Sequence, residues 1–403
     1  MSSYEIKVPY DWAERRKWLR LPFPEGEYRD RVARLVGLME ARGLEALLIY
    51  GQGLDANLRY LANLQSHGGE SAMAVTSDGQ SWISTTWLLH GEPMHSMVWE
   101  SWVEEFVPAA DGPELMRRAV DWLKDKAAGP RGGYVARIGL SGFGVMPVGA
   151  WDALRESLGG QPDICDDMML TLRLTKSAKE AEYLRKACVI SGAGIQAAMD
   201  AVQAGASEVE VASKAHAEMF LAGAETLAFG TAVVAGPRAG LKHANPSQRR
   251  MKAGELVFLD MGASYEGYNA DLSRCVAVGD EVPRDALDML QRAEDVFHDM
   301  IAAMKPGTAV AELARLYEDA TRAYGYESEA MPAAFGHGVG VSLFERPLMG
   351  RGSPDVLQPG MAFAFEPMLV RYRFGTAVVE ETILITETGA EILSGLPTRI
   401  YSV

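Results

Sequence analysis

A duplicated pattern in the C-terminal half constrains this chain more than any other feature. A glycine, an apolar run and an acid occur in the same spacing twice, ending in Asp260 the first time and in Glu366 the second. Each run is followed by another strand-like segment with a further acid, Asp271 in the first copy and Glu380 in the second. A repeated pattern of this length predicts two copies of one structural unit.

The two copies extend over residues 178–280 and 284–390, and each begins with two predicted helices. A glycine turn and a hydroxyl residue, Ser207 in one copy and Thr308 in the other, separate the helices and predict a capped helix start. Two such halves can fold face to face around a pseudo-twofold axis. We expect that arrangement to gather the four acids at its centre.

Four carboxylates at one buried place repel one another and lose their hydration, so they require positive partners. Divalent cations supply that charge, and the imidazole of His337 between two glycines completes a set of oxygen and nitrogen donors. This donor mixture suits Mn, Co, Fe or Zn. We expect two divalent ions, with bridging and terminal ligands drawn from five residues: Asp260, Asp271, His337, Glu366 and Glu380.

Composition excludes several other classes of protein. The net charge of −15 argues against nucleic acid or an anionic membrane as a partner, and no apolar run is long enough to cross a membrane. The three cysteines, Cys165, Cys188 and Cys275, are scattered and lack the spacing of zinc ligands. They indicate reduced thiols and a cytoplasmic location.

The chain is long enough for two domains. Strands that alternate with helices predict an α/β domain over residues 1–165, and the stretch 162–173 is interpreted as a linker. The duplicated unit occupies the second domain, residues 166–403, so the fold class as a whole is α+β.

These motifs resemble those of the pita-bread metallopeptidase superfamily, which includes methionine aminopeptidase, aminopeptidase P, prolidase and creatinase. The glycine-rich hairpin from Asp260 to Asp271 is similar to the paired-aspartate hairpin of the superfamily, and Gly336-His337-Gly338 resembles its metal-histidine loop. Residues 172–185 are similar to the linker and first helix of the aminopeptidase P, prolidase and creatinase branch. Creatinase lacks the five ligands that this chain keeps.

The resemblance implies a creatinase-like N-terminal domain, a pita-bread C-terminal domain and a homodimer. It also implies that His243 contacts the substrate near the scissile bond, where an imidazole can donate to a developing oxyanion. Tyr268, within the paired-aspartate hairpin, is predicted to help bind the substrate. Glu366 is the candidate proton shuttle, because a ligand acid close to the reacting water can accept its proton.

Two positions differ from the superfamily pattern. Phe344 stands where the peptidase and creatinase branches usually carry a second histidine, and Val378 stands where peptidases tend to carry an arginine. Arg371 or Arg373 are alternatives for that arginine. An aromatic ring at position 344 favours a substrate group that is apolar or cationic.

The expected function is metal-dependent hydrolysis of an amide or related C–N bond in a small substrate, in the manner of an Xaa-Pro peptidase. One alternative is a hydrolase or lyase that acts on a small non-peptide zwitterion, similar to dimethylsulfoniopropionate lyase or ectoine hydrolase. Another is a catalytically silent binding protein on the same fold, which the intact ligand set disfavours.

Overall fold

The chain folds into two compact units, Met1–Leu172 and Arg173–Val403. The computed structural model describes residues 19–66, 68–86, 100–126, 137–372, 374–399 and 401–402. Arg373, one of the two arginines considered above, lies outside the described residues. Each unit is described by itself below.

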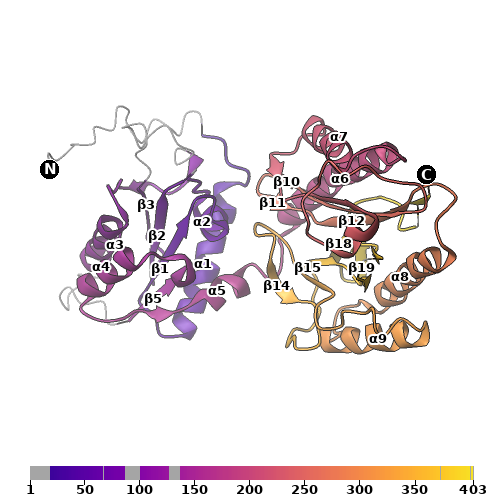
Figure 1. Ribbon diagram of the computed structural model, residues 1–403. Coiled ribbons are helices and arrows are strands. Elements are labelled where there is room, and N and C mark those ends of the chain that lie inside the picture. Colours follow the sequence, from indigo (N-terminus) through magenta and orange to yellow (C-terminus); the bar gives the residue numbers. More distant parts are fainter. Residues whose placement is uncertain are drawn as a thin grey trace. The chain divides into compact units, whose positions relative to one another are not determined.

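The first unit is a twisted six-stranded sheet with helices on both faces (Figure 1). The strands, in spatial order, are β4 (Glu105–Phe106), β3 (Ser81–Thr85), β2 (Glu70–Thr76), β1 (Ala46–Gln52), β5 (Ile138–Ser141) and β6 (Asp163–Ile164). Helices α3 (Gly112–Lys126) and α4 (Val148–Leu158) pack on one face, and α1 (Glu25–Ala41), α2 (Ala56–Ala62) and α5 (Asp166–Leu172) lie on the other. The expected α/β architecture is therefore present.

The expected linker at 162–173 is wrong in detail, because this stretch contains β6 and α5. Met168, Met169 and Leu172 give the helix a buried apolar face. Asp166 and Asp167 occupy its first turn, where a negative charge is favourable. The first unit accordingly ends at Leu172, the last residue of α5.

The second unit begins with the first copy of the repeat. Its elements are α6 (Ala178–Ala201), α7 (Glu208–Leu221), β7 (Thr226–Leu227), β8 (Ala232–Ala235), the 3-10 turn η5 (Gly236–Gly240), β9 (Leu256–Met261), β10 (Ala263–Tyr265), β11 (Tyr268–Asn269) and β12 (Leu272–Ala277). Strands β12, β9 and β8 are neighbours in one sheet, and β20 (Tyr401–Ser402) is added at its edge. Apolar residues of α6 and α7 form one core cluster with this sheet.

The second copy repeats the main order of the first, with two helices, a strand, a second strand, a small hairpin and a third strand, and it adds β14 (Glu345–Leu348) and β19 (Ala390–Ile392). Its other elements are α8 (Arg284–Ala303), α9 (Val310–Ala323), β13 (Gly336–Gly338), β15 (Ala362–Phe365), β16 (Leu369–Arg371), β17 (Gly375–Ala377) and β18 (Glu381–Ile385). Strands β13, β15 and β18 are neighbours, and α8 and α9 share a core cluster with this sheet. In each copy a small hairpin lies in the chain between two strands of the main sheet. The hairpin β10–β11 connects β9 to β12, and the hairpin β16–β17 connects β15 to β18. The α+β fold predicted from the duplication is confirmed.

The helix caps of the two copies differ from expectation. Ser207 caps α7 through a complete capping box with Glu210. The corresponding Thr308 does not cap α9, whose first flanking residue is Ala309 and has no side-chain cap. The hydroxyl of Thr308 instead donates to the carbonyl of Ala303, 3.1 Å away, at the end of α8. The predicted cap at Thr308 is therefore wrong.

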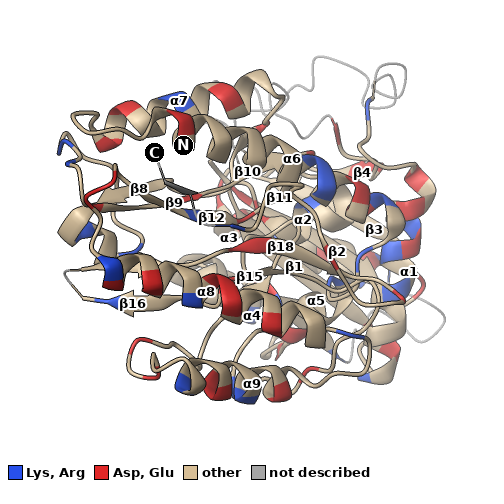
Figure 2. Cartoon of the chain, turned by 90° about the vertical axis from the view of Figure 1, so that its right-hand side faces the viewer, with Lys and Arg blue, Asp and Glu red and all other residues tan. Residues whose placement is uncertain are grey.

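Many charged residues of this unit lie on its helices, and both acidic and basic residues occur along α7, α8 and α9 (Figure 2). The strands between them are almost entirely apolar and buried. Among the described residues, no helix is both long enough and apolar enough to cross a membrane. The acids that are buried in the sheets are therefore exceptions that require an explanation.

Candidate metal centre

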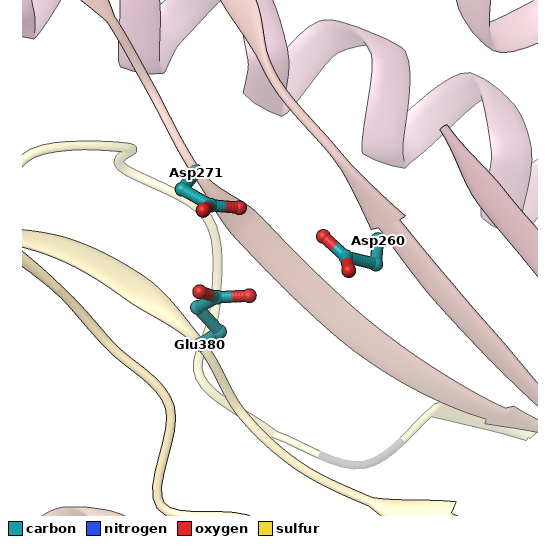
Figure 3. A group of neighbouring side chains, drawn as sticks. All are labelled: Asp260, Asp271 and Glu380. Carbon is teal, nitrogen blue, oxygen red and sulfur yellow. The ribbon is translucent and has the colours of Figure 1, made fainter. Parts of the chain in front are cut away.

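Three of the predicted ligands lie together at the junction of the two sheets. Asp260 is near the end of β9, Asp271 directly precedes β12, and Glu380 directly precedes β18. Each of the three offers a carboxylate oxygen that lies within 4.8 Å of the others, and all three residues are buried. Their side chains point toward one another from different strands (Figure 3).

Strand register explains why these acids meet. In the first copy Asp260 lies opposite Ser273, so Asp271 is two residues from that pair on the neighbouring strand. In the second copy Glu380 forms an isolated bridge with Ser273, and its amide donates to the Ser273 carbonyl over 3.2 Å. Ser273 is thus the point where the two sheets meet. Its hydroxyl also donates to the Glu380 carboxylate.

Glycines make the close backbone approaches possible. A Cβ atom at Gly262 would lie 1.9 Å from the carbonyl oxygen of Ala270, inside the hairpin between the two aspartates. On the other sheet, a Cβ atom at Gly336 would lie 2.2 Å from the Ala364 carbonyl oxygen, and one at Gly338 would lie 2.1 Å from the Arg346 carbonyl oxygen. The glycines in the sequence motifs are therefore required by packing on both sides of His337.

His337 projects from β13 into the same cluster. Its Nε2 atom lies 3.4 Å from Oδ2 of Asp271. Its Nδ1 atom lies 3.1 Å from the carbonyl oxygen of Gly338, which leaves Nε2 as the nitrogen that faces the acids. Burial lowers the pKa of His337, but the hydrogen bond and the charge of Asp271 outweigh burial and raise the pKa overall.

Glu366 follows β15 at the position that corresponds to Asp260 in the first copy. Its amide donates to the Phe335 carbonyl over 3.0 Å, which continues the pairing of β15 with β13. Burial and then the negative charge of Asp271 raise the pKa of Glu366 to about 7. Its own charge in turn raises the pKa values of Asp260 and Glu380.

The electrostatics of the cluster fit a bound cation. Burial, followed by the charges of neighbouring carboxylates, raises the pKa of Asp260 and of Glu380 well above the usual range. Oδ1 of Asp260 is buried and has no hydrogen-bond partner among the described residues. An orphaned carboxylate oxygen beside like charges is unfavourable in the protein alone and favourable as a ligand of a divalent ion. Oxygen donors with one imidazole match the metals expected from the sequence.

Further side chains hold the ligand strands in place. The hydroxyl of Thr382 accepts from the Asp271 amide and donates to the Asp271 carbonyl, each over 3.1 Å. Arg274 forms a buried ion pair with Glu381 and donates to the carbonyls of Ser273 and Glu380, each over 2.8 Å. The sequence motifs contain these residues, but spacing alone did not assign these contacts to them.

His243 lies in the loop that follows η5, and a buried acid on α7 fixes that loop. Glu208 accepts hydrogen bonds from the Ala235 amide (2.9 Å), from the Ser247 amide and hydroxyl (2.9 and 2.6 Å) and from Arg238. His243 itself has a positive φ of 68°. Burial and then the charge of Lys242 lower the pKa of His243, whereas the charge of Asp271 raises it. The charge of Asp271 therefore acts on His243, and a contact of His243 with substrate stays a prediction.

Phe344 lies in the loop after β13, with its ring centroid 4.2 Å from that of His337 and its surface 65% exposed. Glu345 anchors the loop, because its buried carboxylate pairs with Lys176 at 3.0 Å and Arg173 at 3.3 Å and accepts from the Ser342 amide at 3.0 Å. The two cations lower the pKa of Glu345 against the effect of burial, which is the largest influence and raises it. The aromatic face beside His337 is therefore held by a rigid loop.

Two other predicted positions have partners within the protein. Tyr268 is only 1% exposed, and its hydroxyl donates to Glu180 over 3.0 Å, so a contact with substrate stays a prediction. Val378 is buried, as its apolar side chain requires. Arg371 pairs with Glu329 at 3.2 Å and with Asp285 at 3.4 Å, so its guanidinium is engaged elsewhere.

Comparison with known proteins agrees with this geometry. Residues 182–387 match the metallopeptidase family M24. The Xaa-Pro dipeptidase of Pyrococcus furiosus is 35% identical over 231 residues, which are 57% of this chain and 65% of that protein. The Xaa-Pro dipeptidase of Pyrococcus horikoshii is 32% identical over 267 residues, which are 65% of this chain and 75% of that protein.

Among solved structures, an Xaa-Pro dipeptidase from Bacillus anthracis superposes with a TM-score of 0.81 at 22% identity, covering 93% of this chain and 100% of its own. That identity supports the fold alone. The match over residues 182–387 includes every predicted metal ligand, and the relatives align well beyond the motifs themselves. The chain belongs to the metallopeptidase family M24.

Proposed function

We propose that this protein is a metal-dependent hydrolase that cleaves the amide bond of Xaa-Pro dipeptides or closely related small substrates. The observation that carries the proposal is the buried cluster of Asp260, Asp271 and Glu380, with His337 beside it and an orphaned Asp260 oxygen inside it. The similarity to two Xaa-Pro dipeptidases supports the same substrate class.

Two divalent cations, Mn, Co, Fe or Zn, would be held by five residues: Asp260, Asp271, His337, Glu366 and Glu380. Bound there, they supply Lewis acidity that lowers the pKa of water and polarises a carbonyl group. The raised pKa values of Asp260, Glu366 and Glu380 support this proposal, because positive charge bound there would relieve the repulsion between the carboxylates.

Two side chains of this protein are assigned to proton and charge handling. Glu366 is the least buried of the four acids and accepts the proton of the attacking water. His243 projects from the loop fixed by Glu208 and donates to the oxyanion that develops on the substrate carbonyl. Because the lowered pKa of His243 keeps it neutral at pH 7, its N–H donates without carrying a charge.

A second candidate function rests on Phe344. Its exposed ring next to His337 offers an aromatic face, which attracts quaternary cations by roughly 0.5–2 kcal/mol. A hydrolase or lyase that acts on a small zwitterion would use that face in place of a proton donor. A catalytically silent binding protein is disfavoured, because the metal-ligand cluster is intact.

We also propose a cytoplasmic homodimer that associates through the first unit. Phe143 and Val145 in the turn before α4, and Val148 at its start, are 42%, 54% and 73% exposed. Exposed apolar side chains close together in the sequence support an interaction site there. A monomeric mass by light scattering at micromolar concentration would contradict the dimer.

The test is an activity panel on metal-loaded protein. Xaa-Pro dipeptides are compared with betaine-like compounds and cyclic amidines, and metal content is measured by elemental analysis. We expect turnover of Xaa-Pro dipeptides and close to two cations per chain. Turnover of the zwitterions alone would select the second candidate, and a metal-free, inactive protein would support the silent one.

A matched pair of variants separates the assigned histidine from a structural one. We expect His243→Ala to lower kcat by about 10²–10³-fold, the range seen when one oxyanion donor is removed. His216 on α7 hydrogen-bonds Thr231 over 2.8 Å and serves as the control. His216→Ala should leave kcat near the wild-type value, and equal losses in both variants would remove His243 from the mechanism.

A further inference from the structure

We propose that Lys242 binds an anionic group of the substrate, a carboxylate, beside the metal ligands. This deepens the proposed function, on which it rests for the substrate class, by naming the residue that recognises the charged end. Lys242 directly precedes His243, so both side chains project from the loop that Glu208 fixes.

The hydrogen bonding of Lys242 is incomplete. Its ammonium lies 3.2 Å from the thioether sulfur of Met368, two residues after Glu366. A thioether is a weak acceptor, whereas an ammonium has three donors. Across the described part of the chain, no carboxylate lies within ion-pairing distance of Lys242. Two of its donors are therefore available to a ligand.

Other cations around the centre are already paired. Arg274 pairs with Glu381, Arg238 with Glu208, and Lys176 and Arg173 with Glu345. These guanidinium and ammonium groups stabilise the strands and loops of the site. Lys242 differs from them, because it is half-buried beside the site without an acidic partner of its own.

The contact with Met368 places the Lys242 ammonium beside the segment that directly follows Glu366. In agreement with this position, the positive charge of Lys242 lowers the pKa values of both Asp260 and Glu366, opposing the effects of burial and of neighbouring acids. Once Asp260 and Glu366 are engaged as metal ligands, the ammonium has no competing acid and can pair with a substrate carboxylate.

The other positions considered for a substrate-binding cation do not supply one. Val378 is buried at the position where peptidases of the superfamily tend to carry an arginine, and Arg371 is paired with Glu329 and Asp285. Phe344 presents only an aromatic face. The two loops thus differ in chemistry, with an ammonium on the loop after β8 and an aromatic ring on the loop after β13.

The test compares Lys242→Met with Lys242→Arg, which keeps the charge, and with Lys252→Met, a control at an exposed lysine of the turn before β9. The first readout is the dissociation constant of L-proline and of L-prolinamide, measured by calorimetry on metal-loaded protein. We expect wild type, Lys242→Arg and Lys252→Met to prefer L-proline about tenfold or more, as for a charge-assisted hydrogen bond. Lys242→Met should lose that preference at unchanged metal content.

The second readout is kcat/KM for Gly-Pro and for its C-terminal amide. We expect Lys242→Met to lose activity on Gly-Pro, mainly through a higher KM, and to leave the amide unaffected. Equal binding of L-proline and L-prolinamide by wild type, or an unchanged preference in Lys242→Met, would overturn the role of Lys242.

The two readouts separate this inference from the proposed function. If no Xaa-Pro dipeptide is cleaved but the Lys242-dependent preference for L-proline is found, the anion site stands and the dipeptidase assignment fails. If Gly-Pro is cleaved and Lys242→Met behaves as wild type in both assays, the assignment stands and the anion site fails.

Discussion

The two copies of the repeat in the second unit have the same architecture and different side chains at one strand. In the first copy β8 pairs with β9, and Val234 lies opposite Phe258, two residues before Asp260. In the second copy β13 pairs with β15, and His337 lies opposite Ala364, two residues before Glu366. Val234 is therefore the counterpart of His337, the predicted ligand histidine, and it contributes to an apolar core cluster instead.

The loops that follow these two strands differ in the same way. The loop after β8 carries Lys242 and His243 and is fixed by Glu208, whereas the loop after β13 carries Phe344 and is fixed by Glu345. In each copy the shared architecture places one acid before the small hairpin and another after it. The differences between the copies supply the imidazole, the ammonium and the aromatic ring, which are the groups that we propose to determine substrate specificity.

The largest loss of activity is expected on replacing Asp271, which lies near predicted ligands from both copies of the repeat. Asp271 lies within reach of Asp260, Glu380 and His337. We expect Asp271→Ala to abolish metal retention. Its loss of activity should exceed the ~10–100-fold loss that is typical when a residue that only contacts a metal ligand is replaced. Elemental analysis and kcat/KM check this, with Asp319→Ala on the exposed face of α9 as the control. Wild-type metal content in Asp271→Ala would show that the two copies do not share a cation through this residue.

Repulsion between the acids of the two copies should appear in the metal-free protein. The pKa of Glu366 rises from 4.5 to about 7 on folding, so the folded state binds a proton that the unfolded state releases between these values. Stability should therefore fall as pH rises from about 4.5 to 7, by an amount on the order of a few kcal/mol. Urea unfolding at pH 5 and pH 7.5, with and without Mn²⁺, measures the difference.

Added cation should remove most of that pH dependence, because the acids then have positive partners. Asp260→Asn should reduce the slope in the metal-free protein, since it removes one of the interacting charges. A metal-free protein that is more stable at pH 7.5 than at pH 5 would mean that the acids of the two copies do not repel one another in the folded state.

Phe344→His tests the asymmetry between the two loops. A histidine at this position restores a group that can hydrogen-bond a peptide as the transition state forms. Under the second candidate function, we expect Phe344→His to raise a weak kcat/KM for Xaa-Pro dipeptides by about tenfold, without a gain on the native substrate and with unchanged metal content. If the wild-type protein already cleaves these dipeptides at roughly 10⁴ M⁻¹s⁻¹ or more, Phe344 is a tolerated substitution in a peptidase, and the second candidate function fails.

The smallest effect concerns the two helix starts. Ser207→Ala removes a capping box and should lower the free energy of unfolding by about 1 kcal/mol. Thr308→Ala removes one hydrogen bond to Ala303 without uncapping a helix, so its loss should be smaller. Denaturant unfolding of both variants makes the comparison, and equal losses would show that the two hydroxyls have equivalent roles after all.

Much of the second unit could be predicted from the sequence, because its repeat fixes both the element order and the acids that end or precede strands. The glycines at 262, 336 and 338 mark backbone contacts that only glycine permits. Thr308 could not be interpreted correctly, since the same turn sequence allows its hydroxyl to bond backward to α8 or forward to α9. Only tertiary packing decides between these.

The networks behind the site were not predictable, because their partners are far apart in sequence. Glu208 reaches Ser247, and Lys176 reaches Glu345, across separations that no local pattern encodes. Lys242 is adjacent to His243 in the sequence, but its proposed role depends on the lack of a carboxylate within ion-pairing distance among the described residues. A cation next to a histidine that is predicted to contact the substrate is the sequence signal that points to it.

The ion pairs of Glu345 have a practical consequence for dividing the protein. Arg173 and Lys176 belong to the short segment that opens the second unit, and both lie against the carboxylate that fixes the Phe344 loop. A shortened chain that starts at Arg173 keeps these contacts, whereas one that starts at Ser177 leaves a buried negative charge without its cations. Proteolysis within these few residues would therefore disturb the Phe344 loop while leaving all five predicted metal ligands in the remaining chain.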